Sequence, residues 1–334
     1  MALGARDALG SRVAHSLVIT KDDHAPPTLG SLPHVELLET AHPVPDERSL
    51  AAGARLLRWV DELPADAEPL LLVSGGASSL VEALVGGATL DDLVRLNRTG
   101  LAGGLDIAAL NAQRASLSRL KAGQLAGRLG GRGAVALFIS DVPGDDPDVI
   151  GSGLMGTTSG APDDIERRVV ASVDDAVSAA SAAAQQAGLR VVASADRFAG
   201  DAARLAVRFI HELTHTDAQA AIWGGESTLT LPARPGRGGR NQHLALAAAR
   251  LIAGDDDLLL MAAGTDGTDG PTSDAGAIID GETCARLAVA EIDAEEALRA
   301  ADSGTALAAS GDLIDTGPTG TNVGDLVIGL KLRP

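Results

Sequence analysis

The sequence predicts an α/β protein built from two domains. Short apolar runs alternate with Ala-rich segments of helical character, which is the pattern of α/β layers. The chain has 334 residues, of which 45% are hydrophobic, so it exceeds one typical domain and can bury substantial cores. A polar stretch at 214–217 precedes a fresh strand. We therefore expect domains over residues 1–215 and 216–334.

The predicted strands are short and continuously apolar, as expected for strands that are covered on both faces. They are Ser16–Thr20, Val35–Leu38, Leu70–Ser74, Val135–Ser140, Arg190–Ala193, Ala220–Trp223, Leu258–Ala263 and Leu326–Leu330.

Capping residues mark the ends of the predicted helices. Asp46 is a good N-cap, Thr89 with Asp92 resembles a capping box, and Gly188 and Gly254 are typical of helix C-termini. The predicted helices cover residues 46–63, 89–101, 111–126, 163–187 and 240–253.

The composition excludes several classes of function. A formal net charge of -18 disfavours binding to nucleic acid or anionic membranes. Cys284 is the single cysteine, so no intrachain disulfide can form, and no apolar stretch is long enough to span a bilayer. The N-terminus lacks the apolar region of a signal peptide, which makes a cytoplasmic location the default expectation. No GxSxG elbow of a serine hydrolase is present, and no zinc motif is expected.

Residues 70–84 predict a strand, a Gly-Gly-Ala-Ser-Ser turn and a helix. The backbone N–H groups of Gly75 and Gly76, with Ser78 and Ser79, would point at an anion such as phosphate. The motif is neither a Walker A sequence nor GxGxxG. The alternative interpretation is a tight β–α turn that needs glycine for its geometry.

Two further segments carry candidate side chains. Asp141 follows the strand at 135–140, where open α/β sheets bind ligands, so it is a candidate metal or hydroxyl ligand, unless it caps the next helix. In the helix expected over 111–126, Arg114 and Lys121 are seven residues apart and would share one face. Together they could clamp a carboxylate or phosphate, and Lys121 is a candidate catalytic residue. The alternative is a solvated basic face.

The last third of the chain holds the densest polar motifs. In GRGGRNQ (236–242), Arg240 lies in the first turn of a helix, where a cation opposes the helix dipole, so it suggests an anionic ligand. In TDGTDGPTSDAGA (265–277), Asp266 and Asp269 lie on a Gly-rich loop after a strand and suit Mg²⁺ or substrate hydroxyls. The segments GGESTLTLP (224–232) and GPTGTNVGDL (317–326) complete the cluster. Asn241, Thr321 and Asn322 are further candidates for substrate or phosphate binding.

Together these motifs resemble the class II glycerate 2-kinases, the DUF4147/MOFRL family, some members of which carry the older name hydroxypyruvate reductase. The matching segments occur in the family's order and cover nearly the whole chain. Besides the four motifs above, they are VITKDDH (18–24), AHPVPDE (41–47), SGGASS (74–79), LSRLKAGQLA (117–126) and SDVPGDD (140–146).

The resemblance implies a Rossmann-like N-terminal domain and a smaller C-terminal MOFRL domain, with the active site in the cleft between them. It implies transfer of the ATP γ-phosphoryl group, with Mg²⁺, to the 2-hydroxyl of D-glycerate, giving 2-phosphoglycerate. The partners would be a small hydroxy acid and a nucleotide, and a homodimer is one assembly we consider. The family's functional residues carry over to Arg240, to the turn of Gly75, Gly76 and Ser78, and to Asp266 with Asp269.

The chain departs from the family pattern where positive charge is expected. The family usually begins with a strand and a Gly-Lys-Ala turn whose lysine is thought to be catalytic, and Met1 falls just after that place. The family's Arg-Lys-His is Arg114-Ala115-Ser116 here. Either the start lies too late or the chain is a divergent branch, in which Arg114 or Lys121 compensates or activity is lost. The alternatives are a catalytically impaired binding homologue and, ranked last without a GxGxxG fingerprint, an NAD(P)H-dependent hydroxypyruvate reductase.

Overall fold

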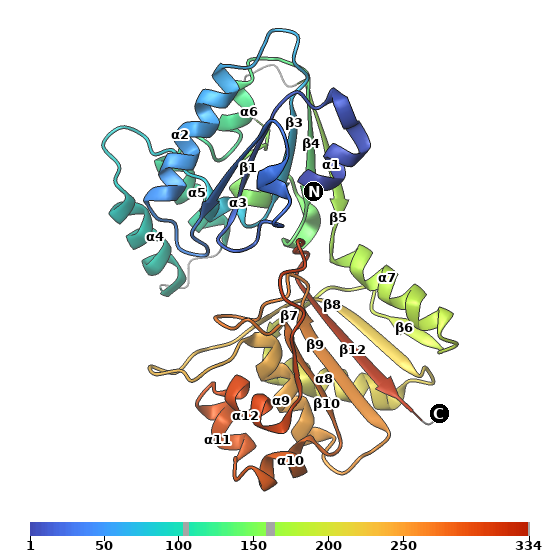
Figure 1. The fold of residues 1–334 in the computed structure, drawn as a ribbon. Helices are drawn as coiled ribbons and strands as arrows, with labels where there is room; N and C mark the ends of the chain where they lie inside the picture. Colours follow the sequence, from blue (N-terminus) through green and yellow to red (C-terminus); the bar gives the residue numbers. More distant parts are fainter. Residues whose placement is uncertain (103–106, 158–163, 333–334) are drawn as a thin grey trace. The chain divides into compact units, whose positions relative to one another are not determined.

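The computed structural model describes residues 1–102, 107–157 and 164–332 (Figure 1). The chain forms two compact units, unit 1 over Met1–Val170 and unit 2 over Ala171–Pro334. Residue 215, near which we expect the domain boundary, is the last residue of a helix within unit 2. Among the described residues, no helix combines the length and apolar character that crossing a bilayer requires.

Unit 1 contains parallel strand pairs, as the α/β prediction requires. In one sheet β1 (Ser16–Lys21) lies parallel to β2 (Val35–Thr40). In the other, β3 (Leu70–Ser74) lies parallel to β4 (Ala134–Ile139), and β5 (Ile165–Ala171) follows β4 in the sheet order. Ser74 pairs with Ile139, so β3 and β4 end side by side. The loops that follow these two strands therefore leave the same edge of the sheet.

Helix α2 (Glu47–Asp61) packs its apolar face on these strands. Leu56, Leu57 and Val60 of α2 belong to the same buried cluster as Phe138 of β4. The cap of α2 is confirmed, because Asp46 accepts hydrogen bonds from the N–H groups of Arg48 and Ser49. The helices are α1 (Ala2–Leu9), α2 (Glu47–Asp61), α3 (Ala77–Leu80), α4 (Leu90–Ala102), α5 (Ile107–Leu117) and α6 (Gln124–Arg128), with 3₁₀ turns at Gly10–Arg12, Leu29–Ser31, Pro143–Asp145 and Ile150–Ser152.

The helix predicted over 111–126 is wrong. α5 ends at Leu117, and the hydroxyl of Ser118 accepts hydrogen bonds of 3.1 Å from the N–H groups of both Leu120 and Lys121. Such side-chain to backbone bonds compete with the helical ladder. The chain then turns through a left-handed Gly123 before α6 begins. Arg114 and Lys121 therefore do not share one helical face.

Unit 2 is built on a mixed sheet with strand order β11-β10-β9-β12-β8-β6, and β7 also pairs with β8. The central pairs are antiparallel, whereas β6 and β7 run parallel to β8. The strands are β6 (Val191–Ala193), β7 (Phe198–Asp201), β8 (Ala220–Thr228), β9 (Leu258–Gly264), β10 (Gly276–Asp280), β11 (Leu313–Ile314) and β12 (Asp325–Lys331). The helices are α7 (Val173–Gln186), α8 (Ala202–His215), α9 (Arg240–Leu251), α10 (Thr283–Val289), α11 (Ala294–Arg299) and α12 (Ser303–Ser310).

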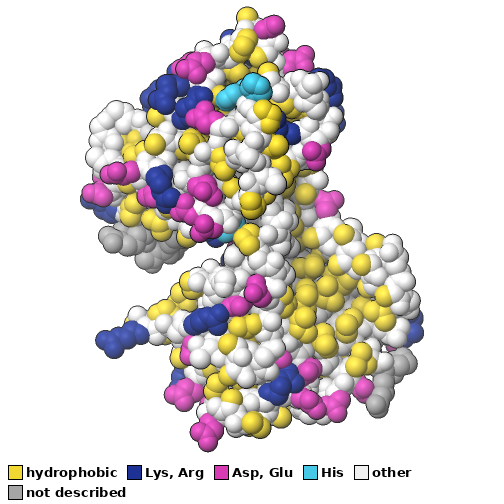
Figure 2. All heavy atoms as spheres, viewed as in Figure 1, with side chains coloured by type: hydrophobic (Ala, Val, Ile, Leu, Met, Phe, Trp, Pro, Cys, Tyr) yellow, Lys and Arg dark blue, Asp and Glu magenta, His cyan; other side chains and the backbone are white. Residues whose placement is uncertain are grey.

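One face of this sheet holds the core of unit 2. Phe209 and Leu213 of α8 and Leu244 of α9 are fully buried against the strands, in one cluster with Leu260 and Val327. Burial on β9 and β12 alternates from residue to residue, as in an antiparallel sheet with one covered face. The prediction that these strands are covered on both faces is therefore wrong. Figure 2 shows hydrophobic side chains gathered over the other face of these strands.

The Ala-rich helix predicted over 163–187 begins later than expected. Residues 165–171 form β5, and α7 starts at Val173 with a capping box between Ser172 and Asp175. Residue 163 lies outside the described residues. The end of the helix matches the prediction, because Gly188 adopts the left-handed conformation at φ 86°.

Candidate functional site

In unit 1, the glycine turn leaves the carboxyl end of β3. Ser78 N–H donates to the Gly75 carbonyl at 3.2 Å, and Ser79 N–H donates to the Gly76 carbonyl at 3.1 Å. These two N–H groups therefore close the turn, although the prediction assigned them to an anion. The hydroxyl of Ser79 also donates to the Gly76 carbonyl, at 3.3 Å. The polar groups of the turn that these three hydrogen bonds do not use include the N–H groups of Gly75 and Gly76 and the hydroxyl of Ser78.

The glycines of this turn leave room for functional side chains. A Cβ at Gly75 would overlap the Asp141 carboxylate, and a Cβ at Gly76 would lie 3.7 Å from Nε2 of His42. The loops after β2, β3 and β4 thus bring His42, Asp141 and the glycine turn together. This is the carboxyl end of parallel strands, where α/β proteins bind ligands. Asp141 was predicted as a site residue, whereas His42 lies in the segment AHPVPDE (41–47) and was not named as one.

Lys121 lies inside unit 1 in a buried ion pair. Its Nζ donates to Oε2 of Glu82 at 2.6 Å, and both side chains are 1% exposed. The Ser118 hydroxyl donates to the other oxygen of Glu82 at 2.5 Å. Burial lowers the pKa of Lys121, and the negative charge of Glu82 opposes that shift. The ammonium predicted to act on a ligand is thus committed to Glu82.

Arg114 lies close to the same pair. Burial lowers its pKa, and the charge of Glu82 acts in the opposite direction. The positive charge of Arg114 also lowers the pKa of Lys121. The charge of Glu82 thus acts on two cations that do not lie on a common helix.

In unit 2, Asp269 holds the first turn of α9. Its Oδ1 accepts from Asn241 N–H at 3.1 Å, and its Oδ2 accepts from Gln242 N–H at 2.7 Å. Helix N-termini carry N–H groups without intrahelical partners, so this buried carboxylate acts as their cap. Burial raises the pKa of Asp269 to about 6, and the hydrogen bonds from Gln242 and Asn241 act against that rise. Asp269 therefore serves helix α9 in this structure, although it was predicted as a metal ligand.

Arg240 is the first residue of α9 and lies between two carboxylates. Its Nη1 donates to Oε1 of Glu226, and its Nη2 lies 3.7 Å from Oδ2 of Asp325. The Glu226 side chain is 50% exposed, whereas that of Asp325 is 4% exposed. The Arg240 side chain is 39% exposed. Arg240 is therefore paired with a buried acid, Asp325, on one side and with an exposed acid, Glu226, on the other.

Asn241 connects the two buried acids. Its Nδ2 donates to Oδ1 of Asp325 at 2.9 Å and approaches Oδ1 of Asp269 at 3.4 Å. Burial raises the pKa of Asp325 to about 6, and the charge of Arg240 is the largest influence in the other direction. Two buried carboxylates, an amide and an arginine thus form one network at the head of α9.

The loop after β9 places Asp266 in a local turn. Its two oxygens accept from the N–H and the hydroxyl of Thr268, each at 2.9 Å. The Asp266 carbonyl accepts from Thr319 N–H at 3.2 Å, which joins this loop to the segment that contains Thr321 and Asn322. Asn322 Oδ1 accepts from Gly324 N–H at 3.0 Å, and the Thr319 hydroxyl accepts from Thr321 N–H at 3.4 Å.

Two residues of this network, Glu226 and Asp325, were missed as site residues. Both lie inside motifs that the sequence singles out, Glu226 in 224–232 and Asp325 in 317–326. Each is an acid that directly follows a glycine, and this pattern could have marked both as candidate site residues. In the part of the chain that the structure describes, no group of three or more His, Cys, Asp or Glu side chains converges on a common metal position.

Comparison with known families matches both parts of the chain. Residues 1–186 match the model of DUF4147, a domain of unknown function, and residues 219–325 match the MOFRL family. The chain belongs to the DUF4147/MOFRL family. The resemblance expected from the motifs is thereby confirmed.

Named relatives align along almost the whole chain. A D-glycerate 2-kinase of Thermotoga maritima is 35% identical, over 99% of this chain and 87% of its own length. A glycerate 2-kinase of Pyrococcus horikoshii is 31% identical, over 90% of this chain and 78% of its own. A putative hydroxypyruvate reductase of Agrobacterium vitis is 36% identical, over 93% of this chain and 80% of its own.

Solved structures agree with these alignments. The crystal structure of a glycerate kinase from Thermotoga maritima superposes with a TM-score of 0.85 at 35% identity, covering 99% of this chain and 88% of that one. A protein from Pyrococcus horikoshii superposes with a TM-score of 0.73 at 29% identity, covering 96% and 83%. The DUF4147/MOFRL architecture of two α/β parts is therefore shared.

Proposed function

We propose that this protein phosphorylates the 2-hydroxyl of D-glycerate, or of a closely related small sugar acid, with ATP and Mg²⁺, giving 2-phosphoglycerate. The observation that carries the proposal is the partly exposed side chain of Arg240, which is paired at the head of α9 with the buried Asp325. The names of the glycerate kinase relatives support the substrate class.

Arg240 is suited to bind a developing negative charge. A cation at a helix N-terminus opposes the helix dipole and needs compensation. Here Glu226 and Asp325 provide it. We propose that a substrate carboxylate or the transferring phosphoryl group takes the position of the exposed Glu226 on Nη1. The buried Asp325 would stay in place and keep the guanidinium oriented, because phosphoryl transfer depends on positioning and electrostatic stabilisation.

The glycine turn of unit 1 is proposed to receive phosphate oxygens. The N–H groups of Ser78 and Ser79 close the turn, which leaves the Gly75 and Gly76 part and the Ser78 hydroxyl to meet an anion. The absence of a Cβ at Gly75 already admits the carboxylate of Asp141 to this edge. A phosphate that approached the same glycines would therefore meet a carboxylate, so a bridging cation is needed.

The residues present fit Mg²⁺, which prefers carboxylate, phosphate and water oxygens. The observation that supports the fit is the Asp141 carboxylate, which fills the space that a Cβ at Gly75 would take. Asp141 of unit 1 and Asp266 of unit 2 are each a proposed ligand within their own unit. Asp269 is a weaker candidate, because both of its oxygens already accept N–H groups of α9. When bound, Mg²⁺ would neutralise phosphate charge during transfer.

Lys121 is given a different role from the catalytic one predicted. Its Nζ is buried and paired with Glu82. We propose that the pair fixes the loop after α3 against the segment that follows α5, and so positions the glycine turn. Asn241 is proposed to orient Asp325, and Thr321 and Asn322 stay candidates for contact with substrate.

A second candidate function is that of a binding homologue that does not transfer phosphate. The observation that favours it is the same buried pairing of Lys121, because a lysine committed to Glu82 supplies no cation to a phosphate. A hydroxypyruvate reductase is named among the relatives, and it is the third activity to assay.

The test measures ADP release with D-glycerate, ATP and Mg²⁺, and identifies the product by phosphorus NMR. Wild type is compared with Arg240→Ala and with Arg237→Ala as a matched control, because Arg237 is also a half-exposed arginine paired with an aspartate, Asp274. We expect the wild type to turn over, Arg240→Ala to lose this activity, and Arg237→Ala to retain most of it. Binding without turnover would establish the second function, and NADH oxidation with hydroxypyruvate would establish the reductase.

A further inference from the structure

The last turn of α8 carries a histidine pair that the proposed function does not use. Residues 211–215 read His-Glu-Leu-Thr-His, the HExxH spacing that places two imidazoles one turn apart on one helix face. The expectation that the chain lacks a zinc motif is therefore wrong. The motif alone is weak, so its geometry decides what it can do.

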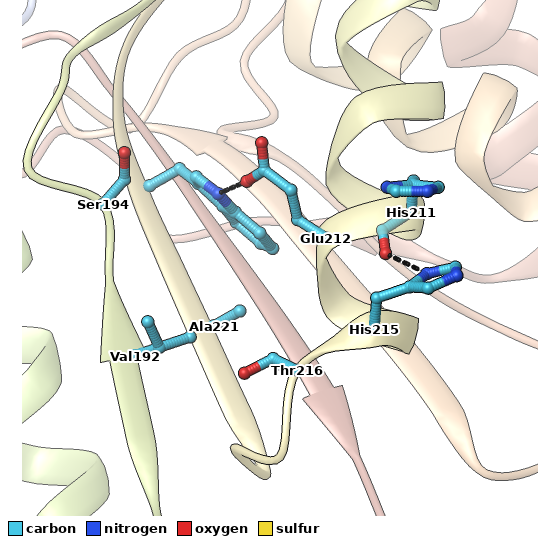
Figure 3. Close-up of a pocket in the computed structure, with 8 residues that line it drawn as sticks. Val192, Ser194, His211, Glu212, His215, Thr216 and Ala221 are labelled. Atoms are coloured by element: carbon cyan, nitrogen blue, oxygen red, sulfur yellow. Dashed lines mark hydrogen bonds between the residues drawn. The ribbon is translucent and has the colours of Figure 1, made fainter.

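The two imidazoles lie together and are accessible. The rings of His211 and His215 stack with their centroids 4.1 Å apart and an angle of 21° between their planes, and both residues are exposed (Figure 3). Nδ1 of His215 lies 2.8 Å from the carbonyl oxygen of His211. A carbonyl only accepts, so this contact puts the proton on Nδ1 and leaves the lone pair on Nε2. Metal-binding histidines commonly make this Nδ1–H contact to a carbonyl, whereas the nearly parallel stack means that one ring must rotate before both Nε2 atoms face one ion.

The glutamate of the motif is committed elsewhere. Oε2 of Glu212 accepts from Nε1 of Trp223 at 2.6 Å, and its Oε1 lies 3.5 Å from Nε of Arg208. In a zinc peptidase this glutamate would activate a water on the metal. Here it points toward Trp223, on the other side of the pocket from the histidine rings (Figure 3). The HExxH segment is therefore not arranged as a hydrolase.

A pocket of about 410 Å³ adjoins the pair, which leaves space for water around a bound ion. Ser194 and Thr216 place hydroxyls on its wall, and Trp223 forms an apolar side. No group of three or more His, Cys, Asp or Glu side chains among the described residues converges on a metal position. Any ion here would take its protein ligands from the two histidines and fill its other positions with water.

We propose that His211 and His215 form an open, two-histidine site for a divalent transition metal ion such as Zn²⁺. Imidazole nitrogen is a preferred ligand of Zn²⁺, Ni²⁺ and Cu²⁺, whereas Mg²⁺ prefers oxygen, so this site is separate from the Mg²⁺ chemistry of phosphate transfer. Binding joins the last two turns of α8. Because the unfolded chain does not hold the two rings together, the ion stabilises the folded state.

The test uses the untagged, full-length protein freed of metal with EDTA. Zn²⁺ binding is measured by calorimetry and by the rise of the melting temperature on adding Zn²⁺. We expect His211→Ala and His215→Ala each to weaken Zn²⁺ binding by about tenfold or more, since loss of supporting partners alone costs about that much at metal sites. The matched control is Glu212→Gln, which keeps an acceptor for Trp223 and is expected to leave Zn²⁺ affinity unchanged.

Competition between ions and the fold of the variants complete the test. Cu²⁺ is expected to bind more tightly than Ni²⁺ and Zn²⁺, and Mg²⁺ not to compete. Melting temperatures in EDTA show whether each variant is folded, and the two exposed histidines are expected to be replaceable. Equal Zn²⁺ affinity in wild type and the two histidine variants would overturn the proposal, as would no binding by wild type. Loss of Zn²⁺ binding in Glu212→Gln would overturn the two-histidine ligand set.

Discussion

Nδ2 of Asn241 donates a hydrogen bond of 2.9 Å to Oδ1 of Asp325, and both side chains are buried. The other oxygen of Asp325 lies 3.7 Å from Nη2 of Arg240. One buried acid from β12 therefore sets the orientation of two neighbouring residues at the head of α9. The proposed anion site depends on this acid, although Asp325 itself is covered.

Asp325→Asn tests this dependence. The amide keeps an oxygen that accepts from Asn241 but loses the charge that faces Arg240. We expect kcat/KM for D-glycerate to fall roughly 10-fold to 100-fold, because small misplacement of a charge-stabilising group is costly. The control is Glu226→Gln, which removes the negative charge of the exposed partner of Arg240. It is expected to lower KM or leave it unchanged, and an equal loss in both variants would contradict the distinct roles.

The two buried acids also predict how stability depends on pH. Asp269 and Asp325 each have a folded-state pKa of about 6 against an ordinary value of 3.8. The folded protein therefore holds more protons than the unfolded chain between these values, and the stability from these groups is present below pH 3.8 and lost as the pH rises through about 6. Urea unfolding of Asp325→Asn should show a larger gain over wild type at neutral pH than at pH 4. A gain that grows toward acid pH would refute the assignment.

Asp269 is expected to be a stability residue. Asp269→Ala leaves the N–H groups of Asn241 and Gln242 buried without their acceptor. The expected cost is about 2 kcal/mol or more in the free energy of unfolding, from the loss of a cap and of buried hydrogen bonds. Asp269→Asn, which keeps one acceptor, should cost less. A neutral effect of Asp269→Ala in urea denaturation would contradict the capping role.

Variants of the Lys121–Glu82 pair test whether Lys121 contributes to stability or to catalysis. Lys121→Met should destabilise unit 1 by about 3–5 kcal/mol, because Glu82 would be left as an unpaired buried charge. The double variant Lys121→Met with Glu82→Gln removes both charges and should regain most of that stability. We expect the double variant to retain measurable turnover. A folded double variant without any ADP release would restore Lys121 as a catalytic candidate.

Gly75→Ala tests the glycine turn. Its new Cβ would overlap the Asp141 carboxylate and displace it. We expect a large loss of turnover and a weaker response to Mg²⁺ concentration. Gly86→Ala is the matched control, because the position of its Cβ has nothing within 4 Å. Similar Mg²⁺ dependence in both variants would show that Asp141 at this turn is not a metal ligand.

Local signals in the sequence predicted local structure well. The cap at Asp46 and the capping box of Thr89 with Asp92 need only neighbouring residues, and both are found. The strand at Leu70–Ser74 was predicted with its observed bounds. The prediction over 111–126 failed because the break depends on Glu82, which is distant in the sequence and draws Lys121 and Ser118 inward.

In the candidate site too, local sequence signals predicted some residues, whereas residues brought in by distant strands were missed. Arg240 was found because a cation at a helix start is a local anomaly. Glu226 and Asp325 face it because β8 and β12 pair antiparallel, with Asp325 beside Gly225, and that register is not readable from either strand alone. The face of β9 and β12 that stays half-exposed likewise follows from the sheet order, which continuous hydrophobic runs do not reveal.

ADP release with D-glycerate, ATP and Mg²⁺, compared between wild type and Arg240→Lys, decides whether the guanidinium of Arg240 supports phosphoryl transfer. Lysine keeps the charge but not the fork that reaches both Glu226 and Asp325. We expect turnover by wild type, 2-phosphoglycerate as the product, and a loss of about 100-fold or more in kcat for Arg240→Lys. Equal kcat in the two proteins, or a wild type without turnover, would refute the proposed role of Arg240.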